Sequence, residues 1–260
     1  MSGSSTGGRR SEVLSALINE YIQSAAPVSS AQIARSYLSG VSSATIRNDL
    51  FALEHDGFVY APHTSAGRIP TNVGYRVFVN RILLSLNNPQ GNLQIHKAMG
   101  IQEIPDNLLT SEVSTDSDFT ADPIYSTLQT LTHLTGLLSV FWWSVKSAKT
   151  RPQIQFTGLS GLLRQPEFAH SDSLAPLLEL LEMPNDIASF SESRLSNSDL
   201  IVLVGLGSKD PYTSYSLLSR RLHFKHPGVL GIIGPTRMEY QKAINALDAA
   251  ARQLEYMLIQ

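Results

Sequence analysis

The chain of 260 residues contains no cysteine, which excludes disulfide bonds and thiolate metal sites. Its seven histidines are scattered without the spacing of metal ligands, so we predict no metal site. No apolar run is long enough to span a membrane, and the first ten residues lack the apolar core of a signal peptide. The sequence therefore predicts a cytoplasmic protein that has no membrane segment and begins with a disordered leader at residues 1–8.

An amphipathic helix is predicted between Ser42 and Gly57. Apolar residues recur along it at the spacing i, i+4, i+7, and at about 100° per residue they form one stripe that must face a core. The residues of this apolar stripe are Ile46, Leu50 and Leu53. Ser42 or Ser43 can cap the start of the helix, and Gly57 can end it.

The opposite side of the same helix carries polar side chains near its start: Thr45, Arg47 and Asn48. In a DNA major groove an Arg side chain can grip guanine and an Asn side chain can grip adenine. The alternative interpretation is an ordinary surface helix with a solvated face. Phe51 lies on the polar arc as well, and it suits groove contact only if it tucks under the neighbouring loop.

The segments around this helix favour the DNA-binding interpretation. Two further helices are predicted before it, at residues 13–22 and 29–38, and three short helices with tight links form a helix-turn-helix unit. A strand at residues 58–60 and a polar loop at residues 61–71 follow, as in a wing that contacts phosphates or the minor groove. The candidate contacts in this loop are His63, Thr64, Ser65 and Arg68. A solvated hairpin tip is the alternative.

The net charge of −2 is unevenly divided along the chain. Residues 1–86 carry seven Lys or Arg side chains against five Asp or Glu, whereas residues 87–260 carry thirteen against seventeen. Positive charge therefore gathers weakly in the predicted DNA-binding segment. Because such a unit neutralises few phosphates, we expect binding to depend on two copies at one site.

Three blocks of the sequence resemble one protein family. The first, at residues 44–79, reads ATIRNDLFALEHDGFVYAPHTSAGRIPTNVGYRVFV and resembles the signature of HrcA, the family of bacterial heat-inducible transcription repressors. The block GLSGLLRQPEF at residues 158–168 and the block PGVLGIIGPTRMEYQKAINALD at residues 227–248 resemble two further motifs of that family, in the family's order.

The resemblance implies a sequence-specific repressor of heat-shock (chaperone) genes that binds a CIRCE-like inverted repeat in double-stranded DNA. It also implies a homodimer, control by a GroEL-type chaperonin, and a place in the bacterial cytoplasm, associated with the nucleoid when bound. We expect no cofactor. The expected DNA contacts are Ser42, Ser43, Thr45, Arg47, Asn48, His63, Thr64, Ser65 and Arg68.

The predicted fold is α+β, with a winged helix-turn-helix domain at residues 9–86, a linker at residues 87–122 and a sheet domain at residues 123–260. Helices are expected at residues 124–138, 174–181 and 236–258, and strands at residues 137–145, 199–205 and 228–233. The resemblance implies that this second domain is a reduced GAF-like domain. Only residues 145–157 stand where the family has more strand and an inserted dimerisation subdomain.

The missing insertion moves the expected dimer contact to surfaces that remain. The helix after Tyr75 and the last helix carry apolar residues that a small sheet would not cover. The residues expected in this contact are Val77, Phe78, Ile82, Leu83, Leu247, Leu254 and Leu258.

Enzymatic interpretations find little support. Gly205 and Gly207 follow a predicted strand, but the third glycine of a dinucleotide-binding turn would fall at Asp210, whose charge repels a pyrophosphate. The pair Trp142 and Trp143 is expected in the core rather than stacked on a ligand. We therefore predict no enzyme. The alternative function is a ligand- or protein-sensing GAF-like module whose winged helix makes nonspecific DNA or protein contacts.

Overall fold

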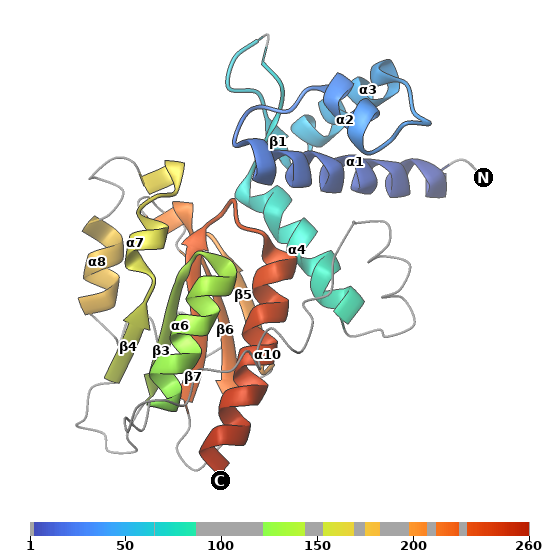
Figure 1. Ribbon diagram of the computed structural model, residues 1–260. Coiled ribbons are helices and arrows are strands. Elements are labelled where there is room, and N and C mark those ends of the chain that lie inside the picture. The colour runs from blue at the N-terminus through green and yellow to red at the C-terminus, as the bar shows by residue number, and fades with distance from the viewer. Residues whose placement is uncertain are drawn as a thin grey trace. The chain divides into compact units, whose positions relative to one another are not determined.

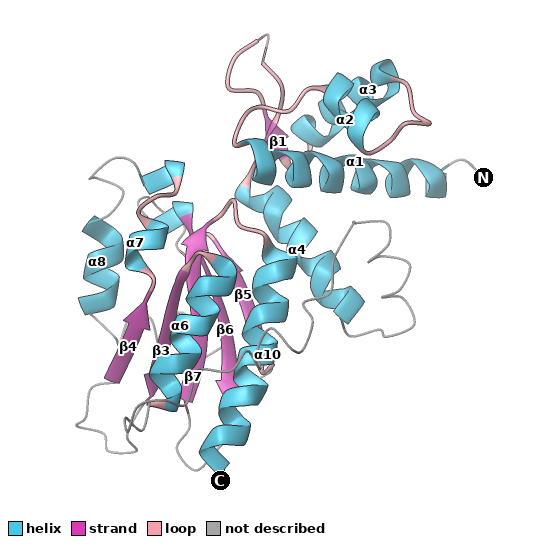
Figure 2. Cartoon of the chain, in the orientation of Figure 1, coloured by secondary structure: helices cyan, strands magenta, loops and turns pink. Residues whose placement is uncertain are grey.

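A computed structural model of the chain describes residues 3–64, 66–86, 122–143, 153–168, 175–182, 198–206, 212–223 and 228–259. It divides the chain into two compact units, residues 1–99 and 100–260. Figure 1 labels most elements of each unit and Figure 2 distinguishes helices from strands. No helix among these residues is long and apolar enough to cross a membrane.

The N-terminal unit consists of helices followed by a short hairpin and a further helix. Its elements are α1 (Gly3–Ser24), α2 (Ser30–Ser36), α3 (Ser43–His55), β1 (Val59–Tyr60), β2 (Ile69–Pro70) and α4 (Asn72–Leu86). The core forms where α2, α3 and α4 pack on α1, and it includes Leu17, Ile33 and Ile46, each wholly buried. Three helices followed by an antiparallel hairpin is the element order expected of a helix-turn-helix with a wing.

Helix α1 begins at Gly3, whereas the sequence predicts a disordered leader at residues 1–8. The difference has a physical cause a few residues further along the chain. Arg9 Nε lies 2.7 Å from Asp49 Oδ2, and Arg10 Nε lies 3.8 Å from Asp49 Oδ1. Because Asp49 belongs to α3 and is buried, these ion pairs attach the early turns of α1 to the core.

The C-terminal unit contains one antiparallel sheet in the order β4-β3-β7-β6-β5. Its strands are β3 (Leu138–Trp143), β4 (Gln153–Thr157), β5 (Leu200–Val204), β6 (Tyr215–Leu222) and β7 (Gly228–Pro235). Its helices are α6 (Pro123–Thr135), α7 (Leu159–Leu162), α8 (Ala175–Glu182) and α10 (Tyr240–Ile259), with short 3₁₀ turns at Pro166–Phe168 and Tyr212–Ser214. Helices α6 and α10 pack side by side on one face of the sheet (Figure 1). The predicted α+β class is confirmed.

Strands β3, β5 and β7 lie where the sequence predicts strands, but β4 and β6 are not predicted by the sequence pattern. Strand β6 reads YSLLSRRL, and its serines and arginines hide the apolar alternation. Strand β4 lies in the short segment that the sequence treats as a connection. Helix α10 begins at Tyr240 rather than at Thr236, because Pro235 is still part of β7.

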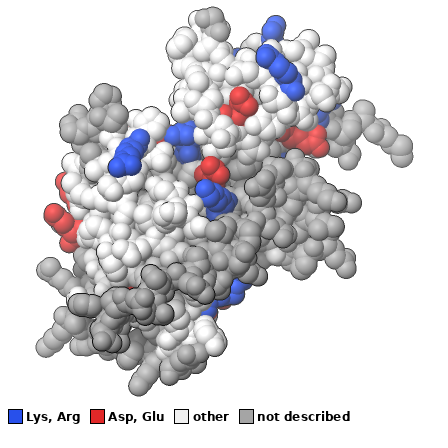
Figure 3. Space-filling model, in the orientation of Figure 1, with Lys and Arg blue, Asp and Glu red and all other residues white. Residues whose placement is uncertain are grey.

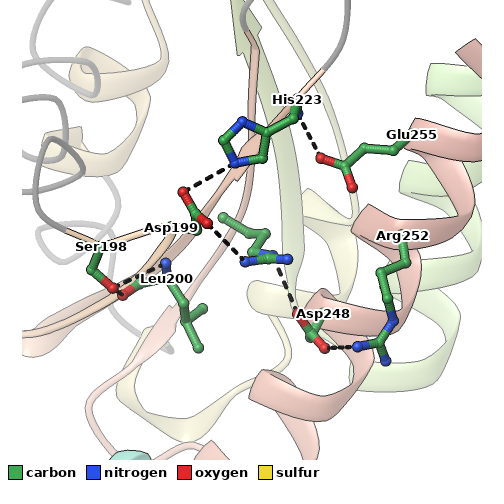
Figure 4. A network of polar contacts seen from close by, with 8 residues as sticks. Ser198, Asp199, Leu200, His223, Asp248, Arg252 and Glu255 are labelled. Carbon is green, nitrogen blue, oxygen red and sulfur yellow. Dashed lines mark hydrogen bonds and ion pairs between the residues drawn. The ribbon is translucent and has the colours of Figure 1, made fainter. Parts of the chain in front are cut away.

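A polar network explains why an arginine is tolerated in β6 (Figure 4). Arg220 Nε lies 3.2 Å from Asp248 Oδ1 of α10, and Arg220 Nη1 lies 4.0 Å from Asp199 Oδ2 beside β5. His223 Nε2 lies 3.0 Å from the other oxygen of Asp199, and the backbone N–H of His223 donates to Glu255 Oε1. The network therefore joins the end of the sheet to α10.

The apolar residues expected in a dimer contact are for the most part covered by the chain itself. Phe78 and Ile82 of α4 are 4% and 1% exposed, and Leu247 and Leu254 of α10 are wholly buried. Helix α10 uses its apolar side against α6 and β6. The expectation that these four residues form a free surface is wrong. Val77, Leu83 and Leu258 are partly exposed.

Trp142 is buried in the core, and Arg237 forms an ion pair. Trp142 is 2% exposed, as expected of a core residue. Arg237 Nε lies 2.5 Å from Glu167 Oε1, and the Arg237 side chain is 12% exposed. This arginine therefore forms an internal salt bridge.

We predict that Tyr240→Phe lowers the free energy of unfolding by about 1–3 kcal/mol, the usual cost of unpaired buried polar groups. The Tyr240 hydroxyl donates to the Thr236 carbonyl and lies 2.9 Å from Ser216 Oγ, so its removal leaves both partners unpaired. Urea unfolding measures the change. Tyr256→Phe is the matched control, because Tyr256 lies in the same helix and is 68% exposed. Equal stability of the two variants would contradict the prediction.

Candidate nucleic-acid interface

Helix α3 begins as the sequence predicts, with Ser42 as its N-cap. The Ser42 hydroxyl accepts a hydrogen bond from the Thr45 backbone N–H at 3.1 Å and lies 2.9 Å from Thr45 Oγ1. Ser43 has a different place, because its hydroxyl lies 3.0 Å from Ser30 Oγ of α2. Of the two serines, Ser42 is exposed at the start of α3, and Ser43 connects α3 to α2.

The two sides of α3 separate as predicted. The apolar stripe is buried, with Ile46, Leu50 and Leu53 between 0% and 4% exposed. Arg47 and Asn48 are exposed, and neither makes a polar contact in the described part of the chain. A guanidinium and a carboxamide therefore stand free on adjacent positions, one turn after the cap, where they can donate and accept hydrogen bonds.

Asp49 is a structural residue of this helix that the sequence analysis does not single out. It is 3% exposed, and its carboxylate accepts hydrogen bonds from Arg9 Nε at 2.7 Å and Arg9 Nη2 at 3.2 Å. The hydrogen bond and the charge of Asp49 raise the pKa of Arg9. The partners stand 40 positions apart in the sequence, so no local pattern could have shown the pair.

The loop between β1 and β2, residues 61–68, is called the wing below. Val59 pairs with Pro70 and Tyr60 pairs with Ile69 at its base. His63 and Thr64 are exposed near its tip. Ser65, the third candidate contact, lies outside the described residues. The tip thus presents an imidazole and a hydroxyl group to solvent.

Arg68, the fourth candidate contact in the wing, is held inside the unit. Its Nε donates to Glu54 Oε2 at 3.0 Å, and its Nη2 lies 2.8 Å from the same oxygen. Its guanidinium carbon lies 5.2 Å from the ring centroid of Phe51, and its side chain is 13% exposed. Phe51 therefore meets the wing through Arg68, and Arg68 is not the free charge that its place in a polar loop suggests.

A backbone bridge holds the other side of the wing. Val28 N–H donates to Arg68 O at 2.9 Å, and Arg68 N–H donates to Val28 O at 2.8 Å. The two backbones approach closely at Gly67, where a Cβ atom would lie 2.5 Å from both C and O of Val28. Only glycine fits there without moving a backbone.

Positive charge does not form a continuous patch on the face shown in Figure 3, where Lys and Arg side chains are few and separate. Within the described part of the N-terminal unit, the carboxylates of Asp49 and Glu54 neutralise nearby arginines. No group of three His, Asp or Glu side chains among the described residues could hold a metal ion. The polar side of α3 and the wing tip therefore offer hydrogen bonding by neutral polar groups and by Arg47, and Arg35 and Arg76 are further exposed arginines of this unit.

A unit of helices with a short hairpin, in one chain with an antiparallel sheet unit, defines a two-unit protein of mixed helix and sheet. The chain belongs to the HrcA family, because the family model described as "HrcA protein C terminal domain" matches residues 99–244, more than half of the chain. The resemblance drawn from the three sequence blocks is confirmed.

Relatives named "Heat-inducible transcription repressor HrcA" align with almost all of the chain or with a part of it. The one from Clostridium botulinum (strain Eklund 17B / Type B) is 24% identical over 336 residues, covering 96% of this chain and 97% of its own. One from Synechococcus sp. (strain JA-2-3B'a(2-13)) is 52% identical over 80 residues, 31% of this chain and 21% of its own. An alignment of 336 residues exceeds this chain of 260, so at least 76 aligned positions face a gap in it.

A solved structure supports the fold. It is described as "Crystal structure of a hypothetical protein at 2.2 A resolution", and it superposes with a TM-score of 0.76 at 18% sequence identity. The alignment covers 96% of this chain and 98% of that one, so the folds agree in both units.

We predict that Gly67→Ala lowers the free energy of unfolding of the N-terminal unit by about 1–3 kcal/mol, as expected for an overpacked site. The added Cβ would meet the Val28 backbone, so the bridge between Val28 and Arg68 must open. Urea unfolding of the full chain measures the loss. Gly40→Ala is the control, because nothing lies within 4 Å of its Cβ position. A Gly67→Ala protein that is as stable as the Gly40→Ala control would contradict this prediction.

Proposed function

We propose that the chain is a sequence-specific transcription repressor of heat-shock genes that binds an inverted-repeat operator of the CIRCE type. The similarity to heat-inducible transcription repressors and membership of the HrcA family support this function. In this proposal residues 9–86 form the DNA-binding domain and residues 123–260 form a GAF-like domain. Residues 87–122 connect them. The chain acts in the bacterial cytoplasm, requires no cofactor and is not an enzyme.

The observation that carries the proposal is the free polar arc of α3. Arg47 and Asn48 are exposed on the side opposite the apolar stripe, next to the capped start of the helix. An Arg can bind the O6 and N7 atoms of guanine with two hydrogen bonds, and an Asn can bind N6 and N7 of adenine in the same way. We assign base contacts to Arg47 and Asn48. Ser42, Thr45, His63 and Thr64 are assigned to the DNA surface around them.

The weak charge of the N-terminal unit favours a homodimer. Arg9, Arg10 and Arg68 lie beside carboxylates, and Arg81 donates to Ser11 O and to the hydroxyl groups of Ser11 and Ser15. Few arginines are left to neutralise phosphates, so one unit alone would bind DNA weakly. An inverted repeat read by a two-fold dimer doubles the contacts. The family resemblance also suggests a GroEL-type chaperonin as the partner that keeps the repressor active.

Footprinting of the purified full chain on DNA upstream of chaperone genes tests the function. Protection of an inverted repeat that persists in excess competitor DNA is expected of a repressor. Protection that disappears with competitor would favour the alternative, a sensing module that contacts DNA nonspecifically. Titration of competitor at fixed salt separates the two outcomes.

We predict that Arg47→Ala or Asn48→Ala weakens operator binding by about 1–3 kcal/mol and changes random-sequence binding much less, because base contacts carry the discrimination. Gel-shift titrations on operator and scrambled DNA measure both affinities. Arg164→Ala is a control that removes an exposed arginine from the C-terminal unit. Equal losses on the two DNAs would reassign these residues to backbone positioning.

The chain is expected to be a homodimer at tens of micromolar, or to become one on the operator. Multi-angle light scattering with and without a duplex carrying the inverted repeat measures the mass. Because Phe78, Ile82, Leu247 and Leu254 are buried, replacing them would test folding rather than dimerisation. A chain that stays monomeric both with and without the duplex would contradict the proposed dimeric repressor and favour the alternative function, the sensing module.

A further inference from the structure

We propose that Glu54 is a positioning residue that fixes the wing to α3, and that Arg68 takes part as its internal partner and not as a phosphate ligand. The proposal rests on the proposed function, since it states how the two DNA-contacting segments keep their spacing. It assigns the wing's DNA contacts to the exposed tip, at His63 and Thr64.

The carboxylate of Glu54 accepts hydrogen bonds from both ends of the wing, next to β1 and β2. Glu54 Oε1 accepts a hydrogen bond from the Ala61 backbone N–H at 3.0 Å, where the wing begins. Glu54 Oε2 accepts from Arg68 Nε at 3.0 Å, where the wing ends. Since Glu54 lies in the last turns of α3, both ends of the wing are bonded to the helix that carries Arg47 and Asn48.

Arg68 is held from several directions. Its guanidinium lies over the ring of Phe51, its Nη1 donates to Ala66 O at 3.2 Å within the wing, and its backbone pairs with Val28. A planar guanidinium with a carboxylate at its edge and an aromatic ring at its face has few orientations left. The wing base therefore has one well-defined arrangement before any DNA is present.

The pairing of Arg68 has an electrostatic consequence. A charge already matched by a carboxylate at 2.8 Å adds little to the field that a phosphate meets. A phosphate ligand would release about one counterion and contribute about one unit to the slope of log affinity against log salt. Arg68 as an internal partner contributes no such unit.

The variant Glu54→Gln separates the two roles because they predict opposite signs. The two donors lie at different oxygens of Glu54, and a glutamine places an NH₂ group at one of these positions, so in this arrangement it cannot accept from both Ala61 and Arg68. If Glu54 positions the wing, operator affinity falls by about tenfold, the size expected for loss of a charged hydrogen-bond partner. If Arg68 binds phosphate and Glu54 competes for it, the variant frees Arg68, so affinity rises and the salt slope steepens.

The experiment uses the full chain and measures operator affinity from 50 to 200 mM salt, roughly the range over which phosphate contacts dominate. Asp56→Asn is the matched control, because it removes an exposed carboxylate from the C-cap of the same helix. Arg68→Ala should lose affinity without a shallower slope. The double variant Glu54→Gln, Arg68→Ala should lose no more than either single variant. A slope shallower by about one unit in Arg68→Ala would overturn the proposal.

A second measurement does not depend on DNA. Amide hydrogen exchange at Ala61 should become faster in Glu54→Ala and stay unchanged in Asp56→Asn, because Glu54 accepts this N–H and an alanine side chain has no acceptor to replace it. Unchanged exchange at Ala61 in Glu54→Ala would also overturn the proposal. If the wild-type chain shows no specific operator binding, the proposed repressor function fails, and the exchange result alone decides whether Glu54 holds the wing.

Discussion

The rotation of about 100° per residue along α3 determines what each of its side chains can contact. The apolar stripe turns inward and fixes the helix in the core. In that orientation the adjacent Asp49 is also buried in the core, where its carboxylate pairs with Arg9. Glu54 lies at the edge of the core, where it pairs with Arg68 of the wing. The arc with Arg47 is the side left open. Burial of three apolar side chains thus sets the start of α1, the wing and the exposed polar surface together.

Several charged side chains of the N-terminal unit form ion pairs that join its elements to one another. Asp49 lies beside two arginines of α1, and Glu54 binds the arginine of the wing. Each pair joins elements far apart in the sequence, and each removes positive charge from the surface that would face DNA. Ion pairs of this kind position segments more reliably than they add stability. The unit gains a fixed relation between helix and wing and loses long-range attraction for phosphates.

The sequence predicts the parts of this arrangement that depend on local periodicity. The apolar stripe of α3, its Ser42 cap and the strands β3, β5 and β7 each follow from residues within one element. Strand β6 is not predicted because its charged Arg220 interrupts the apolar alternation. The ion pair of Arg220 with Asp248 of α10, which the sequence alone does not show, accounts for an arginine at this position. The internal role of Arg68 is not predicted from the sequence for a similar reason. A polar loop containing one arginine favours a free charge, and the carboxylate that binds it lies 14 positions earlier, on a helix.

The shortness of this chain relative to its relatives is compatible with an intact sheet. Strands β3 and β4 are antiparallel neighbours, with Trp143 opposite Gln153, and nine residues separate them in the sequence. Antiparallel neighbours need only a short connection, so no insertion is required between them for pairing. The family resemblance places an inserted dimerisation subdomain at this connection. The proposed dimer is therefore expected to use surfaces of the two units themselves, and burial of the apolar side of α10 against α6 and β6 removes one of them.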